Sequence, residues 1–502
     1  MRLNALVFCA GAGSLATEIA AARLLAPYYG ASTVVWANVI GLVLASLSLG
    51  YWLGGRLADR RPDPRVLGTV VVAAALLVAV VTFLSRPLLE LSVEGLDELS
   101  TGAVIGSFFA VLLLFAPPVT LLGMVAPFAI RLALSAVSDA GAVAGRLYAL
   151  STVGSLLGTF LSALVAIPLL GTQRTLLASA ALIALPGSLL LGRRWLLAPA
   201  AIAAFMALPP GTIKPQAGVV YEDESLYQYI QVVERDEARR LYLNEGIAVH
   251  SVWRPNDLLT GGVWDTFLVL PPLLGRAPER VAILGNAGGT TARAFGRFYP
   301  QTRIDGVELD GAVSEAGRRY FGLEDNPRLD VHTADARPFL RRTDGRYDLI
   351  VVDAYRPPYV PFYLATREFF ALARDRLAPG GAIALNVATT PDDHRLADGI
   401  ARTLRSELPQ VVVWQPLRFN QIVIGLERRT AIGELRSRAR TRTPESLREL
   451  GELLAGGLSE SDESGDPWTD DRAPVEWITD RMIVEFAASG ESFDEFPLPT
   501  AP

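Results

Sequence analysis

The sequence predicts a multi-spanning all-α membrane bundle in its N-terminal part. In its C-terminal part it predicts a doubly wound α/β domain preceded by a small antiparallel β subdomain. Three observations predict this fold class. Long apolar runs fill residues 3–213, mixed charge and alternating patterns begin after Lys214, and strands alternate with helices from Arg280 onward. Roughly 20 apolar residues are needed to cross a bilayer, and alternating strands and helices are typical of a parallel sheet covered by helices.

The composition supports a membrane protein whose main partner is the lipid bilayer. Hydrophobic residues make up 51% of the 502-residue chain, and the mean hydropathy of +0.31 is too high for an ordinary soluble enzyme. The formal net charge of -6 gives no reason to expect a nucleic-acid partner. The single cysteine, Cys9, excludes an intramolecular disulfide framework and a thiolate metal site.

Residues 1–213 are expected to form the membrane bundle. The apolar runs indicate about seven spans, with six to eight as the range, because Pro117 and Pro118 either kink one long helix or separate two short ones. Glu18 lies in the first run, where a charge is costly and usually faces a bundle interior or an aqueous cavity. It is a candidate polar site, although pairing with an arginine for packing alone is the more ordinary interpretation.

The rest of the chain divides into three parts. Residues 214–268 are expected to form the β subdomain, with strands at residues 225–233 and 240–244 and a turn at Asn244-Glu245-Gly246. The doubly wound domain is expected at residues 269–427. Its predicted strands are residues 281–284, 304–309, 329–333 and 349–352. Residues 428–502 are expected to form a charged, helical or partly disordered appendage.

Acidic residues stand at the carboxyl ends of the predicted parallel strands. Glu308 closes the second strand, Asp335 follows the third and Asp353 ends the fourth, while the glycine-rich turn 285–289 follows the first. Ligands of doubly wound domains bind at this edge of the sheet. The turn alone is also compatible with an ordinary tight turn. Together with a carboxylate that can accept both ribose hydroxyls, it predicts a nucleoside site.

These residues resemble spermidine synthases, the polyamine aminopropyltransferases. The resemblance extends from about Ser225 to Asn386, and the full layout is similar to the membrane-fused form called fused MFS/spermidine synthase. The motifs that carry it are Tyr227-Gln228, Ile283-Leu284-Gly285-Asn286-Ala287-Gly288-Gly289, Val307-Glu308-Leu309-Asp310, Ala334-Asp335-Ala336 and Val351-Val352-Asp353-Ala354. A further motif, Pro467-Trp468-Thr469-Asp470-Asp471, is similar to the tail of the fused form.

The resemblance implies a Rossmann-like domain of the class I S-adenosylmethionine type. It implies decarboxylated S-adenosylmethionine or S-adenosylmethionine as co-substrate, an amine acceptor such as putrescine, no metal, and at least a dimer. The reaction would transfer an aminopropyl group to the acceptor. The residues implied to bind the nucleotide are Gln228, Gly285, Gly288, Gly289, Glu308, Asp335, Ala336 and Asp353.

The sequence departs from the family where the amine would bind. Gly288 stands at the position of an Asp in the glycine turn, Arg356 stands where a catalytic Asp would be, and Trp264-Asp265 replaces a His-Glu pair. An arginine would repel a diammonium substrate. The polyamine pocket is therefore expected to be degenerate, with Asp353 and Asp265 as the remaining candidate catalytic carboxylates.

Three functions stay open at this point. The first is a membrane-attached aminopropyltransferase with a changed acceptor pocket. The second is an S-adenosylmethionine-dependent methyltransferase in which Arg356 recognises an anionic acceptor. The third is a non-catalytic transporter or sensor whose soluble domain binds nucleotide or polyamine.

Two arguments conflict about the side of the membrane on which the C-terminal part lies. Arginines at positions 56, 60, 61 and 65 should make the loop between the second and third spans cytoplasmic. Seven spans then leave the C-terminal part outside, whereas eight leave it in the cytoplasm. Because adenosyl cofactors are made in the cytoplasm, the functional argument favours a cytoplasmic domain.

Overall fold

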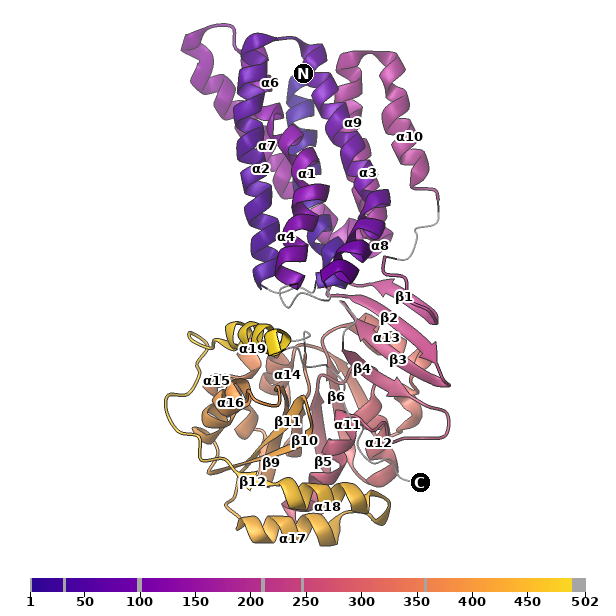
Figure 1. Cartoon of the computed structure of the whole chain (residues 1–502), viewed down its shortest axis with the longest axis vertical. Coiled ribbons are helices and arrows are strands. Elements are labelled where there is room, and N and C mark those ends of the chain that lie inside the picture. The colour runs from indigo at the N-terminus through magenta and orange to yellow at the C-terminus, as the bar shows by residue number, and fades with distance from the viewer. Residues whose placement is uncertain are drawn as a thin grey trace. The chain divides into compact units, whose positions relative to one another are not determined.

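The structure is a computed structural model that describes residues 2–29, 33–96, 102–208, 213–244, 248–355 and 359–489. The chain divides into two compact units. One comprises Met1–Gln216 and Glu222–Tyr229, and the other comprises Ala217–Tyr221 and Ile230–Pro502. The first is a helical unit and the second an α/β unit (Figure 1).

The helical unit is built from long, mostly apolar helices. Its helices are α1 (Arg2–Tyr29), α2 (Thr33–Arg60), α3 (Pro64–Leu96), α4 (Gly102–Leu114), α5 (Ala116–Gly123), α6 (Val125–Ala133), α7 (Ala140–Leu161), α8 (Ile167–Leu170), α9 (Thr172–Leu191) and α10 (Leu197–Phe205). A π-helical segment, Ser162–Ala166, joins α7 to α8. Six helical stretches of the described chain are long and apolar enough to cross a membrane.

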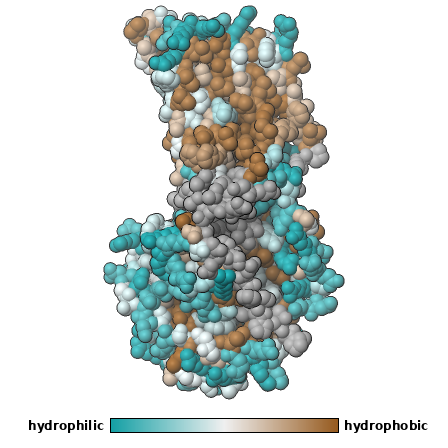
Figure 2. Space-filling view, viewed as in Figure 1, coloured by the Kyte–Doolittle hydropathy of each residue, from teal (hydrophilic) through white to brown (hydrophobic). Residues whose placement is uncertain are grey.

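The surface of the helical unit is hydrophobic. Large apolar side chains are widely exposed: Trp36 is 42% exposed, Leu44 57% and Phe83 53%. Figure 2 shows hydrophobic residues over most of the visible face of this unit, with hydrophilic residues gathered at one end. Exposed apolar surface of this extent marks contact with lipid or a partner. The unit therefore has the surface expected of a membrane bundle.

The fourth span has two local irregularities. α4 ends at Leu114 and α5 begins at Ala116, with the prolines at 117 and 118 in the first turn of α5. Phe115 and Met124, at the two irregularities, keep α-helical backbone angles and i→i−4 hydrogen bonds, so the helix continues through both. Gly50 of α2 packs closely on α5, because a Cβ at this position would lie 2.2 Å from the carbonyl oxygen of Thr120.

A four-stranded antiparallel sheet precedes the doubly wound domain. Its strands, in spatial order, are β1 (Val219–Glu224), β2 (Tyr229–Arg235), β3 (Ala238–Leu243) and β4 (Val249–Trp253). The β2–β3 hairpin turns at Asp236 and Glu237, which have φ of 52° and 60°. Such values are typical of a two-residue hairpin loop. The sequence had suggested a strand from residue 225, but residues 225–228 form a turn.

The doubly wound domain has an eight-stranded mixed sheet in the order β12-β10-β11-β9-β8-β5-β6-β7. Neighbours from β9 to β7 are parallel, whereas β10, β11 and β12 run antiparallel to their neighbours. The strands are β5 (Arg280–Leu284), β6 (Arg303–Glu308), β7 (Leu329–Thr333), β8 (Tyr347–Val352), β9 (Leu377–Ala388), β10 (Gln410–Leu417), β11 (Asn420–Leu426) and β12 (Ser459–Glu460). The predicted fold class is confirmed.

Helices cover both faces of this sheet. In β5, Val281 and Ile283 enter one apolar core, while Ala282 and Leu284 enter the other. Burial on both faces explains the continuous apolar run in the sequence. The helices of this unit are α11 (Val263–Thr266), α12 (Thr290–Phe298), α13 (Gly311–Tyr320), α14 (Ala336–Arg342), α15 (Arg367–Arg374), α16 (Arg395–Arg405), α17 (Ile432–Arg442), α18 (Arg448–Gly457) and α19 (Val475–Ser489).

The segment after residue 427 packs against the domain as far as the structure describes it. Leu435 of α17 and Leu450 and Leu454 of α18 are buried in the same core as Val281. The ring of Trp468 lies on the backbone of α16, where a Cβ at Gly399 would be 2.1 Å from it. Its carbonyl accepts a hydrogen bond from the backbone N–H of Arg367. The expected appendage is thus helical and contributes to the core.

Candidate functional site

The glycine-rich turn joins β5 to α12 at the carboxyl edge of the sheet. Gly285 has φ of +93°, and a Cβ there would lie 2.5 Å from the carbonyl oxygen of Asp353 at the end of β8. Gly289 has φ of +87° and precedes the first residue of α12. Both positions therefore require glycine, one for a close backbone approach and both for their conformation.

Glu308 connects the turn to the end of β6. Its Oε2 accepts a hydrogen bond from the backbone N–H of Ala287 at 3.0 Å, and its Oε1 accepts one from the backbone N–H of Asp310 at 3.1 Å. Burial raises the pKa of Glu308 to about 7. A carboxylate has about four acceptor positions, so Glu308 keeps acceptor capacity for a ligand hydroxyl group.

The buried amide of Asn286, in the same turn, has no hydrogen-bond partner among the described residues. Buried polar groups are normally paired. The amide packs on β6, where a Cβ at Gly306 would lie 2.8 Å from the Cγ of Asn286.

Asp335 begins α14 immediately after β7. One carboxylate oxygen caps the helix by accepting from the backbone N–H of Arg337 at 3.0 Å, and the other accepts from the hydroxyl of Tyr363 at 2.9 Å. Ala336 follows as the first residue of the helix and is buried against the apolar core. Its N–H belongs to the first helical turn, where N–H groups lack intrahelical acceptors.

Asp353 follows β8 and is held by a chain of amide hydrogen bonds. Nδ2 of Asn386 donates to Oδ1 of Asp353 at 2.9 Å, and Nδ2 of Asn420 donates to Oδ1 of Asn386 at 2.8 Å. Burial raises the pKa of Asp353 to about 7, and the hydrogen bond from Asn386 opposes this rise. A carboxylate titrating near neutrality can accept a proton from a reacting group.

The turn, Glu308, Asp335 and Asp353 therefore meet at one edge of one sheet. Residues 267–413 match the family model described as the spermine/spermidine synthase domain. The C-terminal part of this chain contains a spermidine synthase domain. No group of three His, Cys, Asp or Glu side chains that could hold a metal comes together in the described part of the chain.

Characterised relatives are similar to this spermidine synthase domain. A probable polyamine aminopropyl transferase of Bifidobacterium longum is 32% identical over 294 residues, which are 54% of this chain and 65% of that protein. A polyamine aminopropyltransferase of Vibrio vulnificus is 31% identical over 198 residues, which are 38% of this chain and 65% of that protein. The chain thus spans just under two thirds of the length of each.

Among solved structures, a probable spermidine synthase from Corynebacterium glutamicum is 20% identical. That alignment covers 58% of this chain and all of the other, with a TM-score of 0.39.

Gly288 packs against β4 of the four-stranded sheet. Its N–H donates to Oγ of Ser251 in β4 at 2.8 Å. A Cβ at Gly288 would lie 2.9 Å from that Oγ and 3.2 Å from Cγ of Phe321. The space that an Asp would need here is therefore occupied by Ser251 and Phe321.

The carboxylate of Asp265 is engaged by its own loop. It accepts hydrogen bonds from the backbone N–H groups of Thr260 and Gly261, at 2.9 Å and 2.7 Å, and from the Thr260 hydroxyl at 3.1 Å. Burial raises its pKa to about 6. These contacts give Asp265 a structural task in addition to the catalytic role expected from the sequence.

Two other residues of interest lie in the other unit or outside the described residues. Gln228 lies in the segment Glu222–Tyr229, which belongs to the helical unit, where its backbone N–H donates to Oγ of Ser225 at 3.0 Å. Arg356 lies outside the described residues.

Sequence reasoning missed the residues that hold the acids in place. Asn386 and Asn420 lie on the neighbouring strands β9 and β11, and Tyr363 lies between β8 and α15. Asp470, in the tail motif, pairs with Arg337 at 2.6 Å. The tail motif was a signal for Asp470, but nothing in the local sequence marked the two asparagines.

Proposed function

We propose that the protein is a membrane-attached transferase of the aminopropyltransferase type. Its co-substrate is an S-adenosyl thioether, decarboxylated S-adenosylmethionine, and its acceptor is an amine. The observation that carries the proposal is the meeting of the glycine turn, Glu308, Asp335 and Asp353 at the carboxyl edge of a sheet within a spermidine synthase domain.

Each acid has a stated role in this proposal. Glu308 accepts the two ribose hydroxyls, and Asp335, with the first N–H groups of α14, contacts the base. The neutral acceptor amine attacks the methylene carbon beside the sulfonium, the carbon–sulfur bond breaks, and methylthioadenosine leaves. Asp353 takes the proton that the new secondary amine releases, for which a pKa of about 7 is suited.

The acceptor pocket differs from that of a diamine-binding enzyme. Gly288 supplies no carboxylate, and Ser251 fills the space where one would stand. The reacting amine therefore faces a single carboxylate, Asp353, and not several carboxylates. The acceptor in this proposal is an amine that needs fewer counter-charges than putrescine.

Calorimetry on the full chain in detergent tests the nucleotide site. Decarboxylated S-adenosylmethionine, S-adenosylmethionine and methylthioadenosine are titrated in turn, and product formation from amines is followed by mass spectrometry. Glu308→Ala should weaken binding at least ~100-fold, because two hydrogen bonds to a charged group contribute about 1.5–3 kcal/mol each. Glu315→Ala, which removes a half-exposed carboxylate on α13 that pairs with Arg319, should leave affinity unchanged.

Binding of none of the three ligands would overturn the proposal. Methyl transfer from S-adenosylmethionine in place of aminopropyl transfer would select the methyltransferase alternative. Binding without turnover of any amine would select the sensor alternative.

The side of the membrane follows from a separate argument within the helical unit. The hydroxyl of Tyr28, at the end of α1, donates to the carbonyl of Ile213 at 2.6 Å, and Thr172, at the start of α9, donates to the carboxylate of Glu224. The chain thus leaves the bundle at the end where α1 ends and α9 begins. This supports seven crossings, with α10 as the last.

More arginines lie at the other end of the bundle than at this one, where Arg23, Arg86 and Arg174 are found. Arg60 ends α2, Arg131 lies in the last turn of α6, and Arg193 and Arg194 follow α9. Arginine-rich loops face the cytoplasm. The proposal therefore places the spermidine synthase domain outside the cytoplasm, whereas cofactor supply favours the cytoplasm. The nucleotide would then have to reach the domain on the outer side of the membrane. A phosphatase fusion at the C-terminus should be active, and an inactive fusion beside a fluorescent GFP fusion would refute this orientation.

A further inference from the structure

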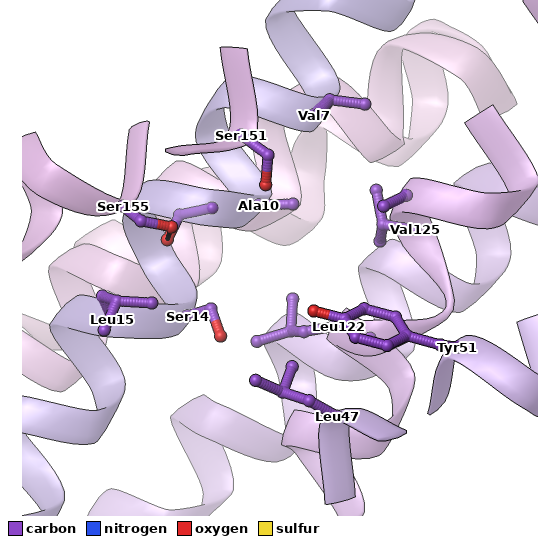
Figure 3. A pocket seen from close by; sticks show the side chains of 13 residues that line it. Val7, Ala10, Ser14, Leu15, Leu47, Tyr51, Leu122, Val125, Ser151 and Ser155 are labelled. Atoms are coloured by element: carbon purple, nitrogen blue, oxygen red, sulfur yellow. Dashed lines mark hydrogen bonds between the residues drawn. The ribbon is translucent and has the colours of Figure 1, made fainter. Parts of the chain in front are cut away.

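A small cavity lies inside the helical unit, between four of its helices. Its volume is about 70 Å³. It is lined by α1, α2, α7 and the α5–α6 stretch. Figure 3 shows the side chains around it. Ser14 is 12 residues from the start of α1, roughly 18 Å at 1.5 Å per residue. The cavity therefore lies near the middle of a hydrocarbon core about 30 Å thick.

Hydroxyl groups from three helices border the cavity. Ser14 comes from α1, Tyr51 from α2, and Ser151 and Ser155 from α7. In Figure 3 the oxygen atoms of Ser14 and Tyr51 point into the space from different sides. Ser155 donates to the carbonyl of Gly11 at 3.3 Å.

The other three hydroxyls have no protein partner within the described ranges. No described residue forms a hydrogen bond with the hydroxyl of Ser14, Tyr51 or Ser151. Ser14 is only 7% exposed. A polar group in an apolar bundle that lacks a partner costs free energy. These hydroxyl groups are therefore available to form hydrogen bonds with a ligand or with water.

The one nearby charge on α1 is negative. Glu18 is four residues after Ser14 and seven after Gly11, so it lies on the same face of α1 as the cavity lining, one turn further along. It is 16 residues from the start of the helix and 11 from its end, and so is within the hydrocarbon span. No described residue pairs with it. A carboxylate in this setting marks a functional site by default.

The wall of the cavity that α5 and α6 form is apolar. Leu122, Gly123 and Val125 line it on either side of Met124. Met124 keeps α-helical backbone angles and its N–H donates to the carbonyl of Thr120, so the helix continues past the cavity.

We propose that this cavity and Glu18 form a binding site for an alkylammonium ion. The hydroxyl oxygens accept N–H groups of the ammonium, and Glu18 supplies the counter-charge. The apolar side chains of Val7, Leu47 and Leu122 contact methylene groups. No basic side chain lines the cavity, which disfavours an anion. An inorganic divalent ion would need six or more oxygen ligands, and the apolar walls do not offer them.

Photolabelling of the full chain in detergent tests this site without nucleotide present. The probe is an alkyl diamine that carries a diazirine, with unlabelled putrescine as competitor, and labelled peptides are mapped by mass spectrometry. We expect labelling of α1 or α2 that putrescine displaces. Glu18→Gln should reduce it at least tenfold and Tyr51→Phe about threefold. Glu90→Gln is the matched control, because Glu90 lies on α3, paired with Arg86 at 3.0 Å, and should change nothing.

Three outcomes would overturn the proposal. They are labelling that putrescine does not displace, labelling confined to peptides after residue 230, and labelling of α1 that survives Glu18→Gln. Tyr51→Phe keeps the test decisive if Glu18→Gln fails to fold, since it removes one hydroxyl from a side chain that is 48% exposed. Glu308→Ala should leave this labelling intact while abolishing nucleotide binding, so the two proposals fail independently.

Discussion

The nucleotide half and the amine half of the predicted site differ in where their polar groups come from. Glu308 and Asp335 follow directly from β6 and β7, and the backbone of the adjoining turn or helix binds each carboxylate. Asp353 also ends a strand, but its partner Asn386 comes from β9. Gly288, where the resemblance implies an Asp, is packed by Ser251 from a different sheet.

This difference explains why the two halves can change independently. A carboxylate fixed by its own strand end persists as long as the parallel sheet does. A pocket assembled from other elements can be remodelled without disturbing that sheet.

Asp353→Asn should have the largest effect on the amine half. If Asp353 takes the proton from the attacking amine, its loss should slow transfer by about 10²- to 10⁴-fold, the usual contribution of a positioned base. Nucleotide affinity should change only a few-fold. Single-turnover rates and calorimetry on the same preparation separate the two quantities.

Asp330→Asn provides the matched control for this variant, because Asp330 is an exposed carboxylate on β7. An equal loss of nucleotide affinity in Asp353→Asn would assign Asp353 to the nucleotide half. An unchanged transfer rate would mean that another group takes the proton.

The sequence predicted where the strand-end acids stand and most of the sheet, because both depend on local pattern. The apolar run Val281–Leu284 and the acids at strand ends are readable without knowing the fold. Ser251 packs on Gly288 from 37 positions away in the sequence. No local sequence pattern predicts this contact. The buried leucines of α17 and α18, including Leu450 and Leu454, do show a four-residue spacing. Many charged residues surround these leucines in the sequence and obscure the spacing. For this reason the segment was predicted to be an appendage.

Gly288→Asp should have the next largest effect, because it forces the missing carboxylate into the amine half. A Cβ at this position would lie 2.9 Å from Oγ of Ser251. Overpacking of this kind costs about 1–3 kcal/mol, and we expect a lower thermal midpoint. Ser251→Gly combined with Gly288→Asp should recover stability and bind putrescine more tightly than the parent chain.

A double-mutant cycle with Ser251→Gly alone measures this coupling. Additive effects of the two changes would show that Ser251 does not determine what residue 288 can be. A stable double variant without any gain in putrescine affinity would place the acceptor elsewhere.

Asn386→Ala should have the smallest effect, confined to low pH. The transfer rate of the parent chain should rise with pH through about 7, because Asp353 accepts a proton only when ionised. Since Asn386 donates a hydrogen bond to that carboxylate, it favours the charged form and lowers the pKa. Removing it should move the midpoint upward by on the order of one pH unit. At pH 6 the variant should be about tenfold slower, and at pH 9 it should match the parent. Asn420→Ala, which acts on Asp353 only through Asn386, should shift the midpoint less. A midpoint that falls, or that does not move, would show that a group other than Asp353 controls the reaction.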